Sequence, residues 1–183
     1  MRVIAGEARS LPLKTVRSLE VRPTTDKIKE TLFNMLMPYL NGCRFLDLYA
    51  GSGAIGIEAI SRGARCAVFV DNSRAAQSCI EDNLRFTKFE DRSRLIKTDV
   101  LSALRRLEAG EPFDVIFMDP PYDEELEKET LRVLKDSPLV TGETLIVVEA
   151  SRQTDFSYVE KWGFRITKDK LYKTNRHLFL MKA

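Results

Sequence analysis

The sequence predicts an α/β fold: a Rossmann-like, doubly wound, mostly parallel sheet of seven strands whose last strand is antiparallel, with a short N-terminal arm. Apolar runs of strand length alternate with amphipathic runs of helix length between residues 43 and 149, which is the rhythm of right-handed β-α-β units. The first strand ends in a glycine-rich turn, as is typical where such a sheet binds a ligand. Two strand-like runs near the end are expected to close the sheet.

The elements follow from periodicity and from start and stop signals. A first helix is expected after a cap at Thr24 or Thr25, and Asn41-Gly42 is expected to end it. The strands are predicted at 43–49, 64–71, 93–97, 113–118, 144–149, 163–173 and 177–181. The helices that alternate with them are predicted at 54–62, 73–86, 99–107 and 124–135. Ligands of such sheets lie outside the carboxyl ends of the strands, so the residues that follow each strand are candidates for chemistry.

Length and composition indicate one ordinary domain. The chain has 183 residues, of which 44% are hydrophobic and 31% charged, and this is enough to bury a core. We expect a strand-rich arm at 1–22 and the main domain at 23–183. No stretch is long and apolar enough to cross a membrane, and residues 1–15 lack the apolar centre of a signal peptide. A cytoplasmic protein without a membrane partner is therefore expected.

The turn after the first strand contains G-x-G-x-x-G, formed by Gly51, Gly53 and Gly56. Asp71 ends the second strand about twenty residues later, where the dinucleotide fingerprint places an acidic residue that binds ribose hydroxyls. By themselves these residues favour a nicotinamide-dependent oxidoreductase. Asp71 can accept hydrogen bonds from both hydroxyls of a ribose.

Asp47 argues for a different ligand. It lies four positions before the first glycine, inside an apolar strand, where a carboxylate is costly to bury without a partner. A cationic ligand would supply that partner, and S-adenosylmethionine carries an ammonium and a sulfonium group but no phosphate. The alternative role is a cap on the amides of the turn. After the third strand, Asp99 could accept from the adenine amino group, could cap the next helix, or could do both.

The segment Asp119-Pro120-Pro121-Tyr122 follows the fourth strand and is the most specific signal in the chain. Two prolines fix the backbone, so the Asp119 carboxylate and the Pro120 carbonyl could accept both hydrogens of one amino group. These acceptors would localise a lone pair that is otherwise delocalised into an aromatic ring. Tyr122 offers a stacking face worth roughly 1–3 kcal/mol. The prediction is methylation of an amino group on a planar ring, without a metal or a strong base; the alternative is an ordinary strand-to-helix turn.

Basic residues gather at both ends of a chain whose net charge is only +2. The two ends could form one face for phosphates, or could be solvated surface. His177 is the only histidine, so a histidine-based metal site is not expected, and we predict a surface position for it on a strand. The candidate RNA contacts are Arg9, Lys14, Arg17, Arg22, Lys173 and Arg176.

These motifs resemble one family. FLDLYAGSGAIGIEA resembles the cofactor-binding motif of class I methyltransferases, DPPY resembles their amino-methylating motif, and VRPTTDKIKETLFNML is similar to a segment of the bacterial RsmD-type family. Members methylate the N2 atom of a guanine in small-subunit (16S) ribosomal RNA. The arm departs from the family's usual RGRKL run, because residues 9–14 here read RSLPLK.

The resemblance implies roles for particular residues. It implies a class I methyltransferase fold, S-adenosylmethionine as cofactor and ribosomal RNA as partner, either free or within a small-subunit particle. It places Asp119 to Tyr122 around the target amine and 22–24 along one side of the pocket, where Arg22 could instead contact a phosphate. The cofactor-binding residues that it implies are Asp47, Ala50, Gly51, Ser52, Gly53, Asp71, Asp99 and Val100.

Three other functions stay open at this point. A DNA methyltransferase acting on adenine N6 or cytosine N4 would use the same sites, but 183 residues leave no room for the usual target-recognition domain. A nicotinamide-dependent oxidoreductase would leave Asp47 and the DPPY segment unexplained. A non-catalytic RNA-binding module would need no DPPY segment.

Overall fold

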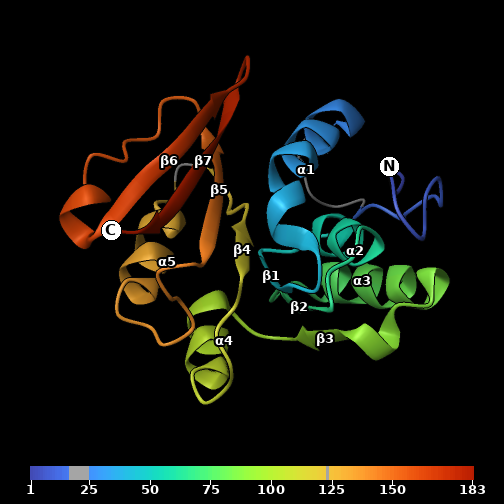
Figure 1. Ribbon diagram of the computed structural model, residues 1–183. Helices are drawn as coiled ribbons and strands as arrows, with labels where there is room; N and C mark the ends of the chain where they lie inside the picture. Colours follow the sequence, from blue (N-terminus) through green and yellow to red (C-terminus); the bar gives the residue numbers. More distant parts are fainter. Residues whose placement is uncertain (17–24, 123) are drawn as a thin grey trace.

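The computed structural model describes residues 1–16, 25–122 and 124–183 (Figure 1). One sheet runs through the molecule, in the order β3-β2-β1-β4-β5-β7-β6. The strands are β1 (Arg44–Leu48), β2 (Cys66–Val70), β3 (Ser93–Ile96), β4 (Val115–Met118), β5 (Leu145–Ser151), β6 (Phe164–Leu171) and β7 (Asn175–Lys182). The helices are α1 (Asp26–Leu40), α2 (Ala54–Ser61), α3 (Arg74–Thr87), α4 (Val100–Leu107) and α5 (Leu126–Leu134).

The topology confirms the predicted doubly wound sheet. Strands β3, β2, β1, β4 and β5 are parallel, and β7 is antiparallel to both of its neighbours, β5 and β6. The strand order reverses between β1 and β4, which is the switch point where such sheets bind ligands. The predicted carboxyl ends of β1, β2, β3 and β4 therefore all lie at one edge.

Helices cover both faces of the sheet (Figure 1). On one face, α1, α2 and α3 bury apolar side chains such as Phe33 and Ile57 against Phe45, Phe69 and other sheet residues. On the other face, α4 and α5 pack against a second apolar cluster. No helix within the described ranges has both the length and the apolar character that crossing a membrane requires.

The arm differs from the expectation of strands. Its described part, residues 1–16, contains one isolated bridge between Arg2 and Pro12. Beside this bridge the amides of Val3 and Leu13 donate to the carbonyls of Leu11 and Met1. Other amides of the arm bond to α2: Glu7 donates to the Ser61 carbonyl at 2.8 Å and Ala8 to the Ser61 hydroxyl at 2.9 Å. Gly6 permits this approach, since a Cβ there would lie 1.8 Å from the Ser61 carbonyl oxygen.

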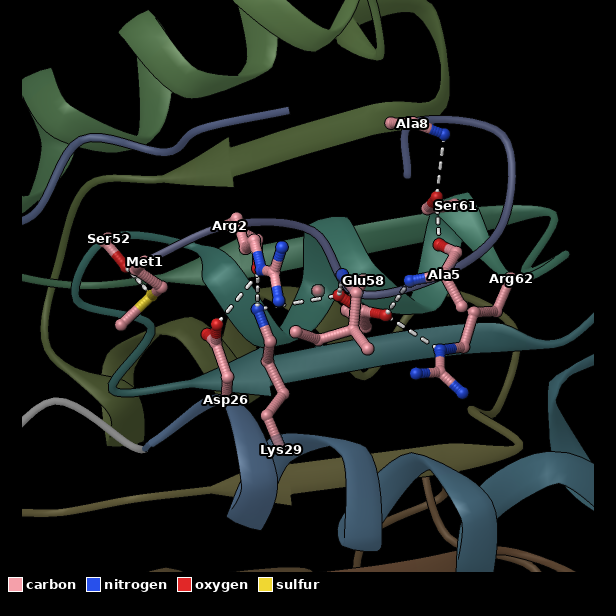
Figure 2. Close-up of polar contacts among 12 residues, drawn as sticks. Met1, Arg2, Ala5, Ala8, Asp26, Lys29, Ser52, Glu58, Ser61 and Arg62 are labelled. Carbon is pink, nitrogen blue, oxygen red and sulfur yellow. Dashed lines mark hydrogen bonds and ion pairs between the residues drawn. The ribbon is translucent and has the colours of Figure 1, made fainter. Parts of the chain in front are cut away.

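A buried ionic cluster fixes the same arm (Figure 2). Glu58 of α2 accepts hydrogen bonds from the amides of Ile4 and Ala5, at 2.9 and 3.1 Å. It also forms ion pairs with Lys29 of α1 at 3.5 Å and with Arg62 at 2.8 Å, and Lys29 donates to the backbone carbonyl of Arg2. The arm, α1 and α2 are thereby held together by one set of charges.

The N-terminus of α1 forms as predicted in its described part. The hydroxyl of Thr25 accepts a hydrogen bond from the Ile28 amide at 3.3 Å and caps the helix. The other proposed cap, Thr24, lies outside the described residues, as do Arg22 and Pro23 of the same segment.

Candidate active site

Asp47 lies on β1 beneath the glycine turn and is only 1% exposed. Its Oδ2 accepts a hydrogen bond from the amide of Gly56 at 2.9 Å, so it does cap the turn. Burial raises the pKa of Asp47 to about 8, and the negative charge of Asp71 adds to this rise, although the Gly56 hydrogen bond opposes it. Among the described residues, the charged groups that interact with Asp47 are two other acids, Asp71 and Asp119. A positive charge bound near Asp47 would favour its ionised form.

Three amides of the glycine turn have partners within the protein. The Gly51 amide donates to Oδ2 of Asp71 at 2.9 Å, the Gly53 amide donates to the Ala50 carbonyl at 2.8 Å, and Gly56 donates to Asp47. A pyrophosphate binds such a turn through amides that point at it. These contacts, together with the acidic side chains, disfavour the nicotinamide alternative. Gly51 and Gly53 have φ of 56° and 77°, which favours glycine at both positions.

Asp71 connects two loops at the rim of the site. Its second oxygen, Oδ1, accepts a hydrogen bond from the Ser73 amide at 2.9 Å, while Oδ2 holds Gly51. The side chain is partly exposed, so both oxygens keep lone pairs for hydroxyl groups of a ligand. The predicted ribose contact is compatible with this position and stays a prediction.

Asp99 is exposed and caps α4, because its Oδ1 accepts a hydrogen bond from the Ser102 amide at 2.9 Å. This hydrogen bond lowers the pKa of Asp99, so the group is ionised at neutral pH. Val100, the next residue, is buried in the core beneath α4. Of the two roles weighed for Asp99, the cap is present, and the adenine contact stays a prediction.

The segment 119–122 follows β4 directly at the switch point. The Asp119 amide donates to the carbonyl of Leu48 on β1 at 3.5 Å, which fixes the turn to the neighbouring strand. Asp119 is half-buried, Pro120 is buried, and Pro121 and Tyr122 are exposed. Burial raises the pKa of Asp119 well above its ordinary value, and the negative charges of Glu149 and Asp47 raise it further.

Tyr122 is 45% exposed. Its position beside Asp119 would allow a flat ring to stack on it. The predicted roles of Asp119 as an acceptor for an amine and of Tyr122 as a stacking ring stay predictions.

Two residues that sequence reasoning missed lie next to this site. Glu149 on β5 and His177 on β7 form a buried pair, with Oε2 and Nε2 2.9 Å apart. The prediction that His177 lies on the surface is wrong, because β7 lies between β5 and β6 and the imidazole is 0% exposed. The signal that could have found the pair is a lone acid in the apolar run 145–150.

Asn83 of α3 is a third residue that sequence reasoning missed. It is 1% exposed, and its side-chain amide donates to the carbonyls of Ser52 at 2.9 Å and of Lys14 at 3.1 Å. Its Oδ1 accepts from the Lys14 amide at 2.8 Å. Asn83 therefore ties the glycine turn to the arm.

The candidate RNA contacts lie in two regions at opposite ends of the sheet (Figure 1). Arg9 and Lys14 are exposed on the arm, which packs against α2 and α3, while Lys173 and Arg176 belong to the β6–β7 hairpin at the other edge. The two basic ends are thus not brought together into one cluster. Two further candidates, Arg17 and Arg22, lie outside the described residues.

Two of these cations have acidic partners. Lys14 forms an ion pair with Asp82 at 2.8 Å, and Arg176 pairs with Asp169. Arg9 and Lys173 form no ion pair with any of the residues that the structure describes. Within the same residues, no group of three or more His, Cys, Asp or Glu side chains is arranged to hold a metal ion.

Comparison with known proteins identifies relatives of this chain. A Bacillus subtilis protein named as a candidate rRNA methyltransferase, YlbH, is 39% identical over 158 residues, which are 85% of this chain and 85% of that protein. The Escherichia coli protein named ribosomal RNA small subunit methyltransferase D is 37% identical over 150 residues, 82% of this chain and 74% of that protein.

The similarity extends to three dimensions. The solved structure of the Escherichia coli candidate methyltransferase yhhF matches with a TM-score of 0.84 at 32% identity, and the match covers 100% of this chain and 97% of that chain. The sequence profile of the family described as "conserved hypothetical protein 95" matches residues 1–181. The chain therefore belongs to this family, together with the ribosomal RNA small subunit methyltransferases D that it resembles.

Proposed function

We propose that this protein is an S-adenosylmethionine-dependent methyltransferase that methylates the exocyclic N2 amine of a guanine in small-subunit ribosomal RNA. The observation that carries the proposal is the position of the Asp119–Tyr122 segment, at the switch point of the sheet and beside a glycine turn lined with acids. In this proposal, residues 1–22 form an arm on a methyltransferase domain at 23–183, and the protein acts in the cytoplasm.

The acids around the turn fit a cationic cofactor. S-adenosylmethionine, when bound, supplies a methyl group on a positively charged sulfur. Asp47 lies under the turn without a cationic partner among the described residues, and an ammonium group nearby would favour its ionised form. Residues 50–53 would surround the methionine part, Asp71 would bind the ribose, and Asp99 with Val100 would lie at the adenine.

The chemistry at the amine is mostly positioning and electrostatics. Asp119 and the Pro120 carbonyl would accept the two hydrogens of the amino group, which favours a pyramidal nitrogen with a localised lone pair. Tyr122 would hold the base by stacking. The proton of the methylated product is acidic enough to leave afterwards, so neither a strong base nor a metal is required.

The identity of the substrate rests on the relatives. The protein of Escherichia coli is named a ribosomal RNA small subunit methyltransferase, and the RsmD-type segment at 21–36 is part of the resemblance. Guanine N2 is the target that this resemblance implies. Among the described residues, exposed cations on the arm and on the β6–β7 hairpin are available for phosphate contacts.

The decisive experiment maps methyl groups in ribosomal RNA. Small-subunit RNA from a strain lacking the gene should lack one methylguanine by mass spectrometry, and the purified protein with S-adenosylmethionine should restore it. Parallel reactions on naked RNA and on small-subunit particles would identify the true substrate. An unchanged methylation map, together with nicotinamide binding and no S-adenosylhomocysteine binding, would disprove the proposal.

A further inference from the structure

A row of polar side chains lies along one face of the sheet beside the site. Residues two apart on a strand point to the same face. In the register of the sheet, Asp47 pairs with Phe117, Phe117 pairs with Val147, and Glu149 pairs with His177. Asp119 is two residues after Phe117, and Glu149 is two residues after Val147. Asp47, Asp119, Glu149 and His177 therefore belong to the same face, on the neighbouring strands β1, β4, β5 and β7.

Glu149 is held in one orientation within this row. It is 5% exposed, its Oε1 accepts from the side-chain amide of Asn175 at 2.8 Å, and its Oε2 is 2.9 Å from Nε2 of His177. The imidazole is fixed in turn, because its Nδ1 is 3.4 Å from the Tyr172 hydroxyl and its ring packs edge-on against Phe117, with centroids 6.3 Å apart. These contacts hold the Glu149 carboxyl group in a fixed position relative to its neighbours.

Among the charges that act on Asp119, the charge of Glu149 has the largest effect. Burial is the main reason why the pKa of Asp119 is raised, and the charge of Glu149 is the next cause, ahead of that of Asp47. Asp119 accepts hydrogen bonds from an amine best as a carboxylate. A negative charge beside it opposes ionisation, and a positive charge shared with His177 would relieve that opposition.

We propose that Glu149 and His177 form a positioning pair for Asp119, which fixes the charge that Asp119 faces and so sets the pH range in which Asp119 can hold the substrate amine. The inference rests on the proposed function, since it assigns these residues to the same reaction. Neither residue touches the reacting atoms; both act through Asp119. Of the described residues, the titratable groups around the pair are Asp47 on β1, Asp119 after β4, Tyr172 before β7 and Lys170 on β6, which pairs with His177 in the sheet register.

The test is the pH profile of single-turnover methyl transfer, measured at saturating S-adenosylmethionine and RNA between about pH 5 and pH 9. Glu149→Gln keeps the shape of the side chain and one of its two acceptor oxygens but removes the charge. The acid limb of its profile should move to lower pH by about one unit or more, because a like charge next to Asp119 is gone. His177→Gln keeps a donor to Glu149 but cannot carry a positive charge, so its acid limb should move to higher pH.

Shifts of the acid limb in opposite directions in the two variants are the result that the pair predicts. A general loosening of the structure would move the acid limbs of both variants in the same direction. Limbs that coincide with that of the wild type, or that move together, overturn the inference. Glu58→Gln is the matched control, because it removes a buried acid whose charge is not among those that raise the pKa of Asp119, and it should leave the limb in place. Circular dichroism and S-adenosylhomocysteine binding verify that each variant is folded.

Failure of the inference can be told apart from failure of the proposed function. If Asp119→Asn loses methyl transfer while the Glu149 and His177 variants keep the wild-type limb, then the function stands and the positioning role is wrong. If Asp119→Asn keeps full activity, then the proposed function itself is wrong.

Discussion

Two buried clusters of charge differ in how their charges are balanced. In the arm cluster, Glu58 faces two cations, Lys29 and Arg62, and two backbone amides (Figure 2). In the site cluster, Asp47, Asp119 and Glu149 lie along one face, and among the described residues only Glu149 has a basic partner, His177. The first cluster is complete without a ligand. In the second cluster, a cation at the cofactor position and an amine at Asp119 would supply the partners that these acids lack.

This difference shows how buried charges that stabilise the fold can be distinguished from buried charges that serve a ligand. A buried charge that is paired and hydrogen-bonded holds elements together, and removing one partner is costly. A buried acid that lacks a cation is unfavourable in the free protein, and its raised pKa records that cost. The pKa values of Asp47 and Asp119 are raised in this way, while Lys29 has its pKa lowered by burial although Glu58 and Asp26 oppose this.

The largest expected effect is on Asp119. Asp119→Asn replaces one of the two acceptors for the amine hydrogens with an amide that can also donate. Methyl transfer should fall roughly 10²–10³-fold, the usual cost of losing one preorganised electrostatic contact in an active site. Single-turnover rates measure this loss, and S-adenosylhomocysteine binding should stay within a few-fold of the wild type. A variant with wild-type rates would show that the amine is bound elsewhere.

The next effect concerns stability at the arm cluster. Glu58→Gln leaves Lys29 and Arg62 without their buried counter-charge, and we expect a loss of about 3–5 kcal/mol in the free energy of unfolding. Urea denaturation measures it. Arg2→Ala is the matched control in Figure 2, because it removes only the exposed ion pair with Asp26 at 3.1 Å and should cost less than about 1 kcal/mol. Equal losses in the two variants would contradict the proposed difference between buried and exposed charges.

Asp47 should make the stability of the free protein depend on pH. Its folded pKa of about 8 lies above the ordinary value of 3.8, so the folded protein binds more protons than the unfolded chain between these values. This contribution is full below about pH 4 and is lost as the pH rises through about 8, with a limiting slope of about 1.4 kcal/mol per pH unit. In Asp47→Asn this slope should be absent.

The measurement for Asp47 is urea denaturation of both proteins across this pH range. The difference in free energy of unfolding, wild type minus Asp47→Asn, should decrease steadily as the pH rises. Binding of S-adenosylhomocysteine near pH 7 should release a proton from the wild type but not from the variant, and calorimetry in buffers of different ionisation enthalpy detects it. A constant stability difference together with no proton release would mean that Asp47 is ionised before the cofactor binds.

The sequence predicted what is local and missed what depends on pairing across the fold. The sheet could be predicted because its strands and helices differ in period, and Asp47 and Asp119 because each adjoins a glycine or proline turn. Glu149 and His177 are 28 residues apart, and only the antiparallel register of β5 and β7 brings them together. The contacts of the arm could not be predicted for a related reason: several of its amides bond to Ser61 and Glu58 of a helix, which no period in residues 1–16 could indicate.

The smallest expected effects concern the surface cations, some of which form an ion pair with an acid and some of which do not. Arg9→Ala and Lys173→Ala remove exposed charges that form no ion pair with the described residues. Each should weaken RNA binding and reduce the slope of log affinity against log salt concentration by about one. Arg176→Ala should change that slope less, since its guanidinium already pairs with Asp169 and packs over the ring of Phe156 at 5.5 Å. Filter binding at several salt concentrations measures all three variants. An Arg176 variant with the steepest loss of slope would show that RNA displaces Asp169, and would place the main phosphate contact on the β6–β7 hairpin.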